Sequence, residues 1–248
     1  MENLKEALEY VVDLSNEAEK TEVVEICGRT YANKTLRRYD IEDKADPVTA
    51  RTLSSLVDYV KNCRHEFPSG KMLVHIVSPE KVCLMSSLDG DRRREILFKS
   101  VAETSGFRYD EWYDQERFMI ALQANFKMND DLKAVMRLSG NIEKKNNQTF
   151  SDDGRTQVAT MTVGVASRAD AIVPNPVELV PYRTFQEVEQ PSSKFVFRIG
   201  DKEVPAFKIV EAEGGIWRNK AIESIKKYLQ TELKNSEIPC DNIITIIG

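Results

Sequence analysis

The sequence contains very little histidine: His65 and His75 are the only two among 248 residues. Hydrolases of the Ser-His-Asp or Cys-His kind need an imidazole beside the nucleophile to accept its proton. His75 lies in the apolar run LVHIV, which is typical of a residue packed in a strand. His65 follows Arg64 where a helix is expected to end, which favours a solvated cap residue. A hydrolase with a histidine base is therefore not expected.

Cysteines are also few, and no two of them have the spacing of a metal-binding pair: Cys27, Cys63, Cys83 and Cys240. The acidic groups SDDG and NDD have no strand context that would gather carboxylates around a metal ion. The glycine stretches GDKE and EAEGG match no phosphate-binding loop. We expect no catalytic residue, no metal and no cofactor, and we expect reduced thiols that are mostly buried.

Long apolar runs and an excess of positive charge are missing as well. No run approaches 18 apolar residues, so no membrane span is expected. The first ten residues, MENLKEALEY, are charged and amphipathic, unlike a secretory signal, which favours a cytoplasmic protein. The formal net charge of -5 argues against non-specific binding of duplex nucleic acid, which depends on many lysine and arginine contacts with phosphates.

Helical patterns are clear in several places. From Asn3 to about Lys20, apolar residues recur at the i, i+3, i+4, i+7 spacing of an amphipathic helix. Asp46 and Pro47 are residues favoured at a helix cap and at the first helical position, which predicts a second helix to about Asn62. Further helices are expected over Asp114–Phe126, Asp130–Arg137 and Trp217–Leu233.

Strand patterns alternate with these helices without a regular βαβ order. Strands are expected at TEVVEICGRTY, closed by Gly28, at KMLVHIVS and VCLMSSL as a hairpin, and at EILFKSVA. Residues 138–165 read as a long exposed hairpin around SDDG, strands flank GDKE, and IITIIG is expected as a buried final strand. This predicts an α+β fold with a mainly antiparallel sheet and flanking helices. The expected organisation is a lobe over 1–140, a connector over 141–175 and a lobe over 176–248, with one continuous domain as the alternative.

The stretch VPYRTFQEVEQP, residues 180–191, has no helix or strand period and follows a proline-rich segment. Prolines at 174, 176 and 181 favour an edge, a crossover or an extended arm. Aromatic and arginine side chains in extended segments are typical interface anchors. The candidate binding residues are Tyr182, Arg183, Phe185, Glu187, Gln190 and, in EGGIW, Trp217. If the protein were an enzyme, its best candidate residues would be Arg183, Glu187, Glu189 and Arg198, but no sequence pattern brings these four together.

Two segments combine basic residues with aromatic or polar neighbours, as in proteins that bind single-stranded nucleic acid. YANKTLRRY and DGDRRRE supply the residues Lys34, Arg37, Arg38, Arg92, Arg93 and Arg94. The neighbouring acids Asp40, Asp89 and Asp91 favour solvated charged loops instead. Both interpretations stay open from the sequence.

Four stretches carry a family resemblance: ADPVTARTLSSLVDYV, MLVHIVSP, ASRADAIVPNPVELVPYRTFQEVEQPSSKFVFR and EAEGGIWRNKAIESIKKYL. With their PYRTFxEVxQP and EAxGGxW motifs, they resemble an uncharacterised protein family of phages and prophages of Gram-positive bacteria. The resemblance covers most of the chain from Ala45 to Leu229. It implies a phage-encoded cytoplasmic protein from the early, non-virion part of a genome, and it carries no catalytic residue.

The expected function is binding and self-assembly without catalysis. The protein would form a homo-oligomer and contact a host-defence component, a host factor or a phage replication partner. The alternative is a single-strand nucleic-acid accessory factor for phage replication or recombination. A third possibility is a virion component whose long hairpin reaches a neighbouring subunit.

Overall fold

The computed structural model describes residues 2–35, 43–68, 71–104, 106–141, 150–152, 156–163, 167–200, 205–234 and 244–248. The chain divides into two compact units, Met1–Lys44 and Ala45–Gly248. Each unit is described by itself below.

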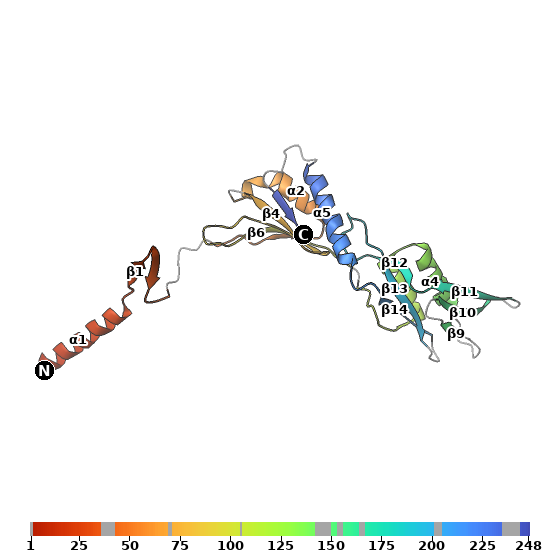
Figure 1. Ribbon diagram of the computed structural model, residues 1–248, viewed down its shortest axis with the longest axis horizontal. Coiled ribbons are helices and arrows are strands. Elements are labelled where there is room, and N and C mark those ends of the chain that lie inside the picture. Colours follow the sequence, from red (N-terminus) through yellow and green to blue (C-terminus); the bar gives the residue numbers. More distant parts are fainter. Residues whose placement is uncertain are drawn as a thin grey trace. The chain divides into compact units, whose positions relative to one another are not determined.

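In its described residues, 2–35 and 43–44, the N-terminal unit has one helix and one hairpin (Figure 1). Helix α1 (Glu2–Glu19) confirms the periodicity of the sequence, and β1 (Val23–Ile26) pairs antiparallel with β2 (Arg29–Ala32). The sequence predicted one strand here, but Cys27 and Gly28 form a two-residue turn with φ of 52° and 72°. Positive φ at both positions is the conformation that suits the twist of a tight hairpin. Cys27 is exposed, contrary to the expectation of mostly buried thiols, while Cys63 is half-buried and Cys83 is buried.

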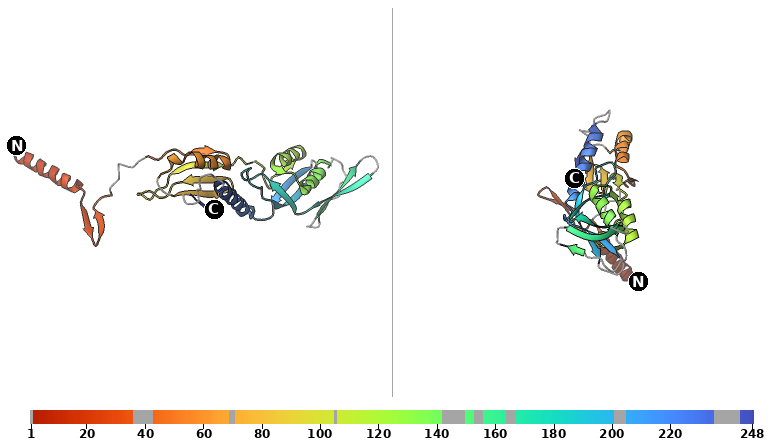
Figure 2. Two further views of the ribbon diagram at one scale, coloured as in Figure 1. Left: turned by 90° about the horizontal axis from the view of Figure 1, so that it is seen from above. Right: turned by 90° about the vertical axis from the view of Figure 1, so that its right-hand side faces the viewer.

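The first sheet of the larger unit is mixed. Its strand order is β15-β4-β5-β6-β3, with bounds Ile244–Ile247, Met72–Ser78, Lys81–Met85, Ile96–Val101 and Val48–Ala50. The predicted β4–β5 hairpin is confirmed, and β15 and β3 pair in parallel with β4 and β6. Helices α2 (Leu53–Asn62) and α5 (Trp217–Lys234) lie side by side on one face of this sheet (Figures 1 and 2). The apolar stripe of α2 is fully packed there: Leu53, Leu56, Val57 and Val60 are all buried.

Two expectations about this sheet were wrong. Residues 46 and 47 do not open a helix, because the following residues form β3 and pair with β6 before α2 begins. The cap of α2 is Thr52, whose Oγ1 accepts a hydrogen bond from the backbone N–H of Ser55 at 3.2 Å. A short 3-10 helix, Arg64–Glu66, follows α2. The final strand is not buried, since β15 is an edge strand and Ile247 is 41% exposed.

The second sheet is entirely antiparallel. Its order is β7-β14-β13-β12-β8, with bounds Tyr113–Asp114, Ala206–Glu211, Ser193–Gly200, Val177–Pro181 and Phe126–Lys127. Helices α3 (Gln115–Asn125) and α4 (Asp130–Asn141) pack side by side against it. Phenylalanines fill the interface: the ring of Phe118 stacks at 5.3 Å from Phe207 and at 6.0 Å from Phe197. The proline-rich strand β12 lies between β13 and β8, so it is not an edge, and Pro181 stands at its end where β13 no longer needs its amide.

A third sheet follows α4, with strand order β11-β10-β9 and bounds Ser167–Pro174, Thr156–Val163 and Phe150–Asp152. The predicted pairing around SDDG is the β9–β10 pair. The predicted start at Leu138 was wrong, because this residue is buried in α4. The longer hairpin is β10–β11, which pairs over eight positions. The α+β class with mainly antiparallel strands, flanking helices and a long hairpin is confirmed.

The larger unit has two hydrophobic cores, and each joins distant parts of the chain. The first combines residues of 53–98 with Phe185, Val188 and α5. The second combines residues of 107–138 with residues of 173–209. Both cores therefore draw on residues from both of the lobes expected from the sequence. None of the helices in the described ranges is long and apolar enough to cross a membrane.

The start of α2 makes a test possible. Thr52→Ala removes a capping hydroxyl and should lower the free energy of unfolding by about 1 kcal/mol. Asp46→Ala should change it by less than about 0.5 kcal/mol, because Asp46 is exposed and precedes the strand. Urea denaturation of the two variants measures both values. A larger loss from Asp46→Ala than from Thr52→Ala would contradict this assignment.

Candidate functional site: the corner at 182–191 and the groove beside it

The segment 182–191 connects β12 to β13 as a corner, and Phe185 is its main anchor. This side chain is 1% exposed and lies in the first core, where Val188 joins it. The hydroxyl of Thr184 donates a hydrogen bond to the carbonyl oxygen of Pro79 at 2.5 Å. The corner therefore leaves the second sheet, inserts into the first core and returns.

Two polar side chains of the corner hold its shape. The Oε1 atom of Glu187 accepts hydrogen bonds from the backbone N–H of Leu53 at 2.7 Å and of Ser54 at 3.1 Å. These amides belong to the first turn of α2, where no intrahelical acceptor exists and negative charge is favoured. Gln190 Oε1 accepts from the backbone N–H of Arg183 at 3.0 Å, and its Nε2 donates to the carbonyl of Phe185 at 2.9 Å. Both side chains thus satisfy backbone groups.

Arg183 is buried, and it connects the PYRTF stretch with the EGGIW stretch. Its guanidinium carbon lies 3.9 Å from the ring centroid of Trp217, and its Nη1 lies 3.1 Å from Oε1 of Glu211. Its Nη2 donates to the hydroxyl of Ser193. Burial lowers the pKa of Arg183, while the nearby Tyr109 and Glu211 act in the opposite direction. Stacking on an indole and pairing with a carboxylate stabilise the guanidinium of Arg183, a residue that is only 7% exposed.

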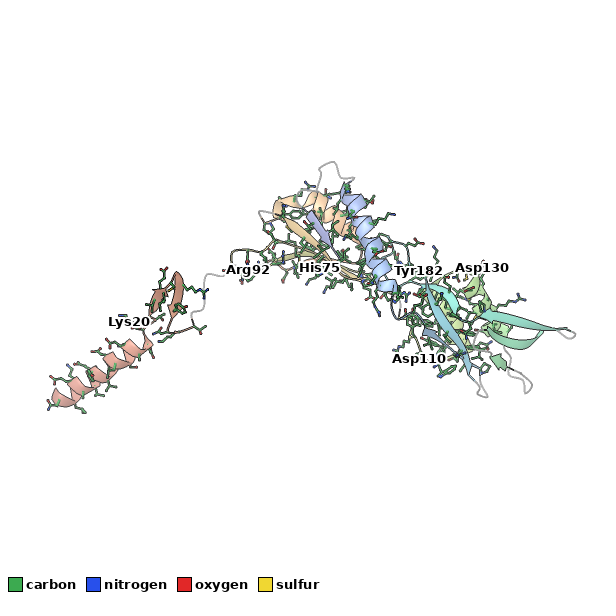
Figure 3. All side chains as sticks on the ribbon, in the orientation of Figure 1. Lys20, His75, Arg92, Asp110, Asp130 and Tyr182 are labelled. Atoms are coloured by element: carbon green, nitrogen blue, oxygen red, sulfur yellow. The ribbon has the colours of Figure 1, made fainter. Side chains whose placement is uncertain are left out.

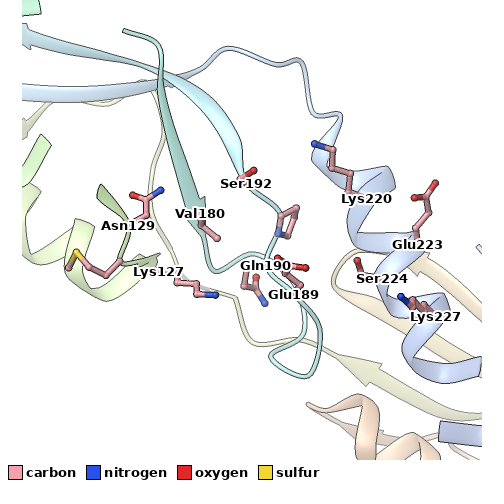
Figure 4. A pocket seen from close by; sticks show the side chains of 12 residues that line it. Lys127, Asn129, Val180, Glu189, Gln190, Ser192, Lys220, Glu223, Ser224 and Lys227 are labelled. Atoms are coloured by element: carbon pink, nitrogen blue, oxygen red, sulfur yellow. The ribbon is translucent and has the colours of Figure 1, made fainter. Parts of the chain in front are cut away.

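A groove of about 610 Å³ lies beside this corner (Figure 4). One wall comes from β8 and the residues after it, with Lys127 and Asn129, and from Val180 of β12. The opposite wall is a face of α5 with residues at i, i+3, i+4 and i+7: Lys220, Glu223, Ser224 and Lys227. Residues 189–192 of the corner complete the lining. In Figure 4, Lys127 reaches toward the hollow from one side, and Lys220 and Lys227 from the other.

A second hollow of about 430 Å³ lies at the N-terminus of α2, beside Thr184 and Glu187. Its arginine, Arg51, is paired with Glu103 at 2.9 Å. The carboxylate of Glu187 already accepts hydrogen bonds from the backbone amides at this end of α2. Among the described residues that line this hollow, the cation is paired and the amides at the start of α2 already have an acceptor.

The predicted binding residues have different positions. Arg183, Phe185 and Trp217 are buried within the chain itself. Glu187 caps α2, and Gln190 both closes the corner and lines the groove. Tyr182, labelled in Figure 3, is 40% exposed.

The four residues named above as the best candidates for an enzyme do not form one catalytic site. Arg183 contacts Trp217 and Glu211, whereas Glu187 contacts α2. Arg198 is in β13, opposite Lys208 of β14. The groove lysines were not predicted as a site, although the spacing on α5 is visible in the sequence.

The basic residues of the nucleic-acid hypothesis are partly occupied. In the loop between β5 and β6, Arg93 lies 3.5 Å from Asp89 and 3.4 Å from Asp91, and Arg94 donates to the carbonyl of Ser86 at 2.8 Å. Arg92, labelled in Figure 3, is exposed. In the N-terminal unit, Lys34 donates to a backbone carbonyl at the end of α1. Arg37 and Arg38 lie outside the described residues.

The chain matches no protein-family model, no curated protein and no solved structure. The resemblance to the phage and prophage family therefore stays an expectation from the sequence. Within the described ranges, no three His, Cys, Asp or Glu side chains form a group that could hold a metal ion.

The buried arginine gives the first test of the corner. Arg183→Lys keeps the charge but loses the planar contact with Trp217 and the paired donors, so it should lower the free energy of unfolding by on the order of 2 kcal/mol. Arg117→Lys is the matched control, because Arg117 is 83% exposed and its pair with Asp114 contributes little. Equal denaturation midpoints for both variants would contradict a stabilising role for Arg183.

Tyr109, beside Arg183, gives a test by pH. Burial raises the pKa of Tyr109 from 10.0 to about 12, although the charge of Arg183 acts to lower it. The fold therefore favours the neutral phenol, and this contribution to stability is present below pH 10.0 and is lost as the pH rises toward 12. Ultraviolet difference titration of the wild type against Tyr109→Phe should show a tyrosinate component near pH 12. A component at the ordinary pKa would contradict the burial of this phenol.

Proposed function

We propose that the protein acts by binding and self-assembly, without catalysis, and that α1 is the element through which copies associate. The observation that supports this is the exposure of apolar side chains on α1. Leu4 is 67% exposed, Leu8 59% and Val11 60%. Such a stripe on a helix calls for a partner, because water-exposed apolar surface is unfavourable.

The spacing of α1 suits a second copy of the same helix. Alternating steps of three and four residues connect Leu4, Ala7, Val11, Leu14 and Ala18. This is the repeat that forms the seam of a coiled coil. In that register Glu6, Glu9 and Asp13 occupy outward positions. An acidic helix can therefore meet its own copy along the seam with these three carboxylates directed away from it.

The expected strength is moderate. Burying one Leu or Val side chain contributes about 1.5–3 kcal/mol, so the large seam residues of two helices supply roughly 9–18 kcal/mol. Association itself costs an estimated ~4–15 kcal/mol. The two ranges overlap, so assembly depends on protein concentration. The hairpin adds exposed apolar side chains that are able to extend the contact: Val23, Val24, Ile26 and Tyr31.

The resemblance to the phage and prophage family supports a location and a partner for the assembled protein. In that setting the assembled protein acts in the cytoplasm of a host cell and binds a host or phage protein. The nucleic-acid alternative has less support, because Arg93 and Arg94 are occupied by neighbouring groups. No described feature favours the virion alternative over it.

Charge at the seam tests the assembly. Val11→Asp places a carboxylate in the apolar stripe and should shift the full chain to monomer at concentrations where the wild type is oligomeric. Asn16→Asp adds the same charge at an outward position and should leave the oligomer intact. Sedimentation velocity over a range of concentrations measures both. A monomeric wild type, or equal dissociation of both variants, would refute self-assembly through α1.

A further inference from the structure

The groove beside the corner gathers three lysines whose side chains have no partner. Neither an ion pair nor a hydrogen bond is formed by the ammonium groups of Lys127, Lys220 and Lys227 within the described part of the chain. Two other lysines of the same unit are paired: Lys208 lies 2.6 Å from Asp110, and Lys133 lies 2.9 Å from Asp130. The groove thus combines a hollow with unpaired positive charge from two separate elements.

The arrangement of α5 leaves these lysines available. Glu223 stands three residues after Lys220 and four before Lys227, spacings at which helical ion pairs form. Neither pair is formed, and among the residues that the structure describes Glu189 on the corner has no ion-pair partner either. The hydroxyls of Ser192 and Ser224 also line the groove and have no hydrogen-bond partner among the described residues.

The mixed charge of the lining restricts the class of ligand. Three ammonium groups favour a compact anion, and lysine binds phosphate as a point charge. Two carboxylates repel a bare anion but accept hydrogen bonds from hydroxyl or amino groups. A molecule that carries both a phosphate and such donors satisfies both sets. The volume of about 610 Å³ lies within the range of small-molecule sites in proteins.

We propose that this groove binds a phosphorylated, hydroxyl-bearing small molecule of about nucleotide size. The phosphate lies between Lys127 of one wall and Lys220 and Lys227 of the other. The serine hydroxyls donate to its oxygens, and Glu189 and Glu223 accept from the hydroxyl-bearing part. All of these residues belong to the larger unit, so the site does not depend on assembly through α1.

Calorimetric titration of the full chain tests this inference with matched pairs of probes. Adenosine 5′-monophosphate is compared with adenosine, and glucose 6-phosphate with glucose. At least one phosphorylated probe should bind about tenfold or more tightly than its unphosphorylated counterpart, and the affinity should fall with added salt. The Val11→Asp variant should bind the same probe equally well, which separates this site from the proposed assembly.

The lysines are tested with a charge-matched pair of variants. Lys220→Ala with Lys227→Ala should weaken binding at least about tenfold. Lys226→Ala with Lys234→Ala removes the same charge from α5 outside the groove and should leave binding unchanged. Circular dichroism checks that both variants fold.

Three outcomes would overturn the inference. The first is that no phosphorylated probe binds at millimolar concentration, and the second is that both double variants lose binding equally. The third is that a thymidine homopolymer binds more tightly than every small probe and that its binding depends on Lys220 and Lys227, which would assign the groove to a nucleic-acid strand.

Discussion

The insertion of the 182–191 corner into the first core is the contact on which the larger unit depends. Phe185 belongs to one core, while the strands on both sides of it, β12 and β13, belong to the other. Glu187 adds an electrostatic contact at the start of α2, and Arg183 adds a buried stack on the start of α5. One short segment therefore fixes two helices and a sheet, and it contributes residues 189–192 to the lining of the groove whose one wall is α5.

Helices and hairpins could largely be predicted from the sequence, because their signals are local. The stripes of α1, α2, α3 and α5 appear at helical spacing and are present in the structure. Asp46 and Pro47 were misleading for a physical reason: pairing of β3 with β6, about fifty residues away, outweighs a local preference for a helix start. The position of β12 inside a sheet was also not visible in the sequence, because its neighbour β8 consists of only two residues that follow a helix.

The candidate site could be predicted only in part. Aromatic and arginine content drew attention to PYRTF and EGGIW, but their meeting through Arg183 and Trp217 depends on the tertiary fold. Most of the binding residues inferred from composition proved to be internal contacts of the chain. The spacing of Lys220, Ser224 and Lys227 is readable in the sequence, yet only the fold shows that Lys127 stands opposite them.

The two cores are nested along the chain, and this orders their completion during synthesis. All buried residues of the second core lie between positions 107 and 209. The first core begins at Leu53 but needs Ile225, Leu229 and Ile244 to close. A ribosome therefore delivers every buried residue of the second core before it delivers Ile225, Leu229, Leu233 and Ile244 of the first core. During that interval the first sheet lacks helix α5, which covers part of one of its faces in the complete fold.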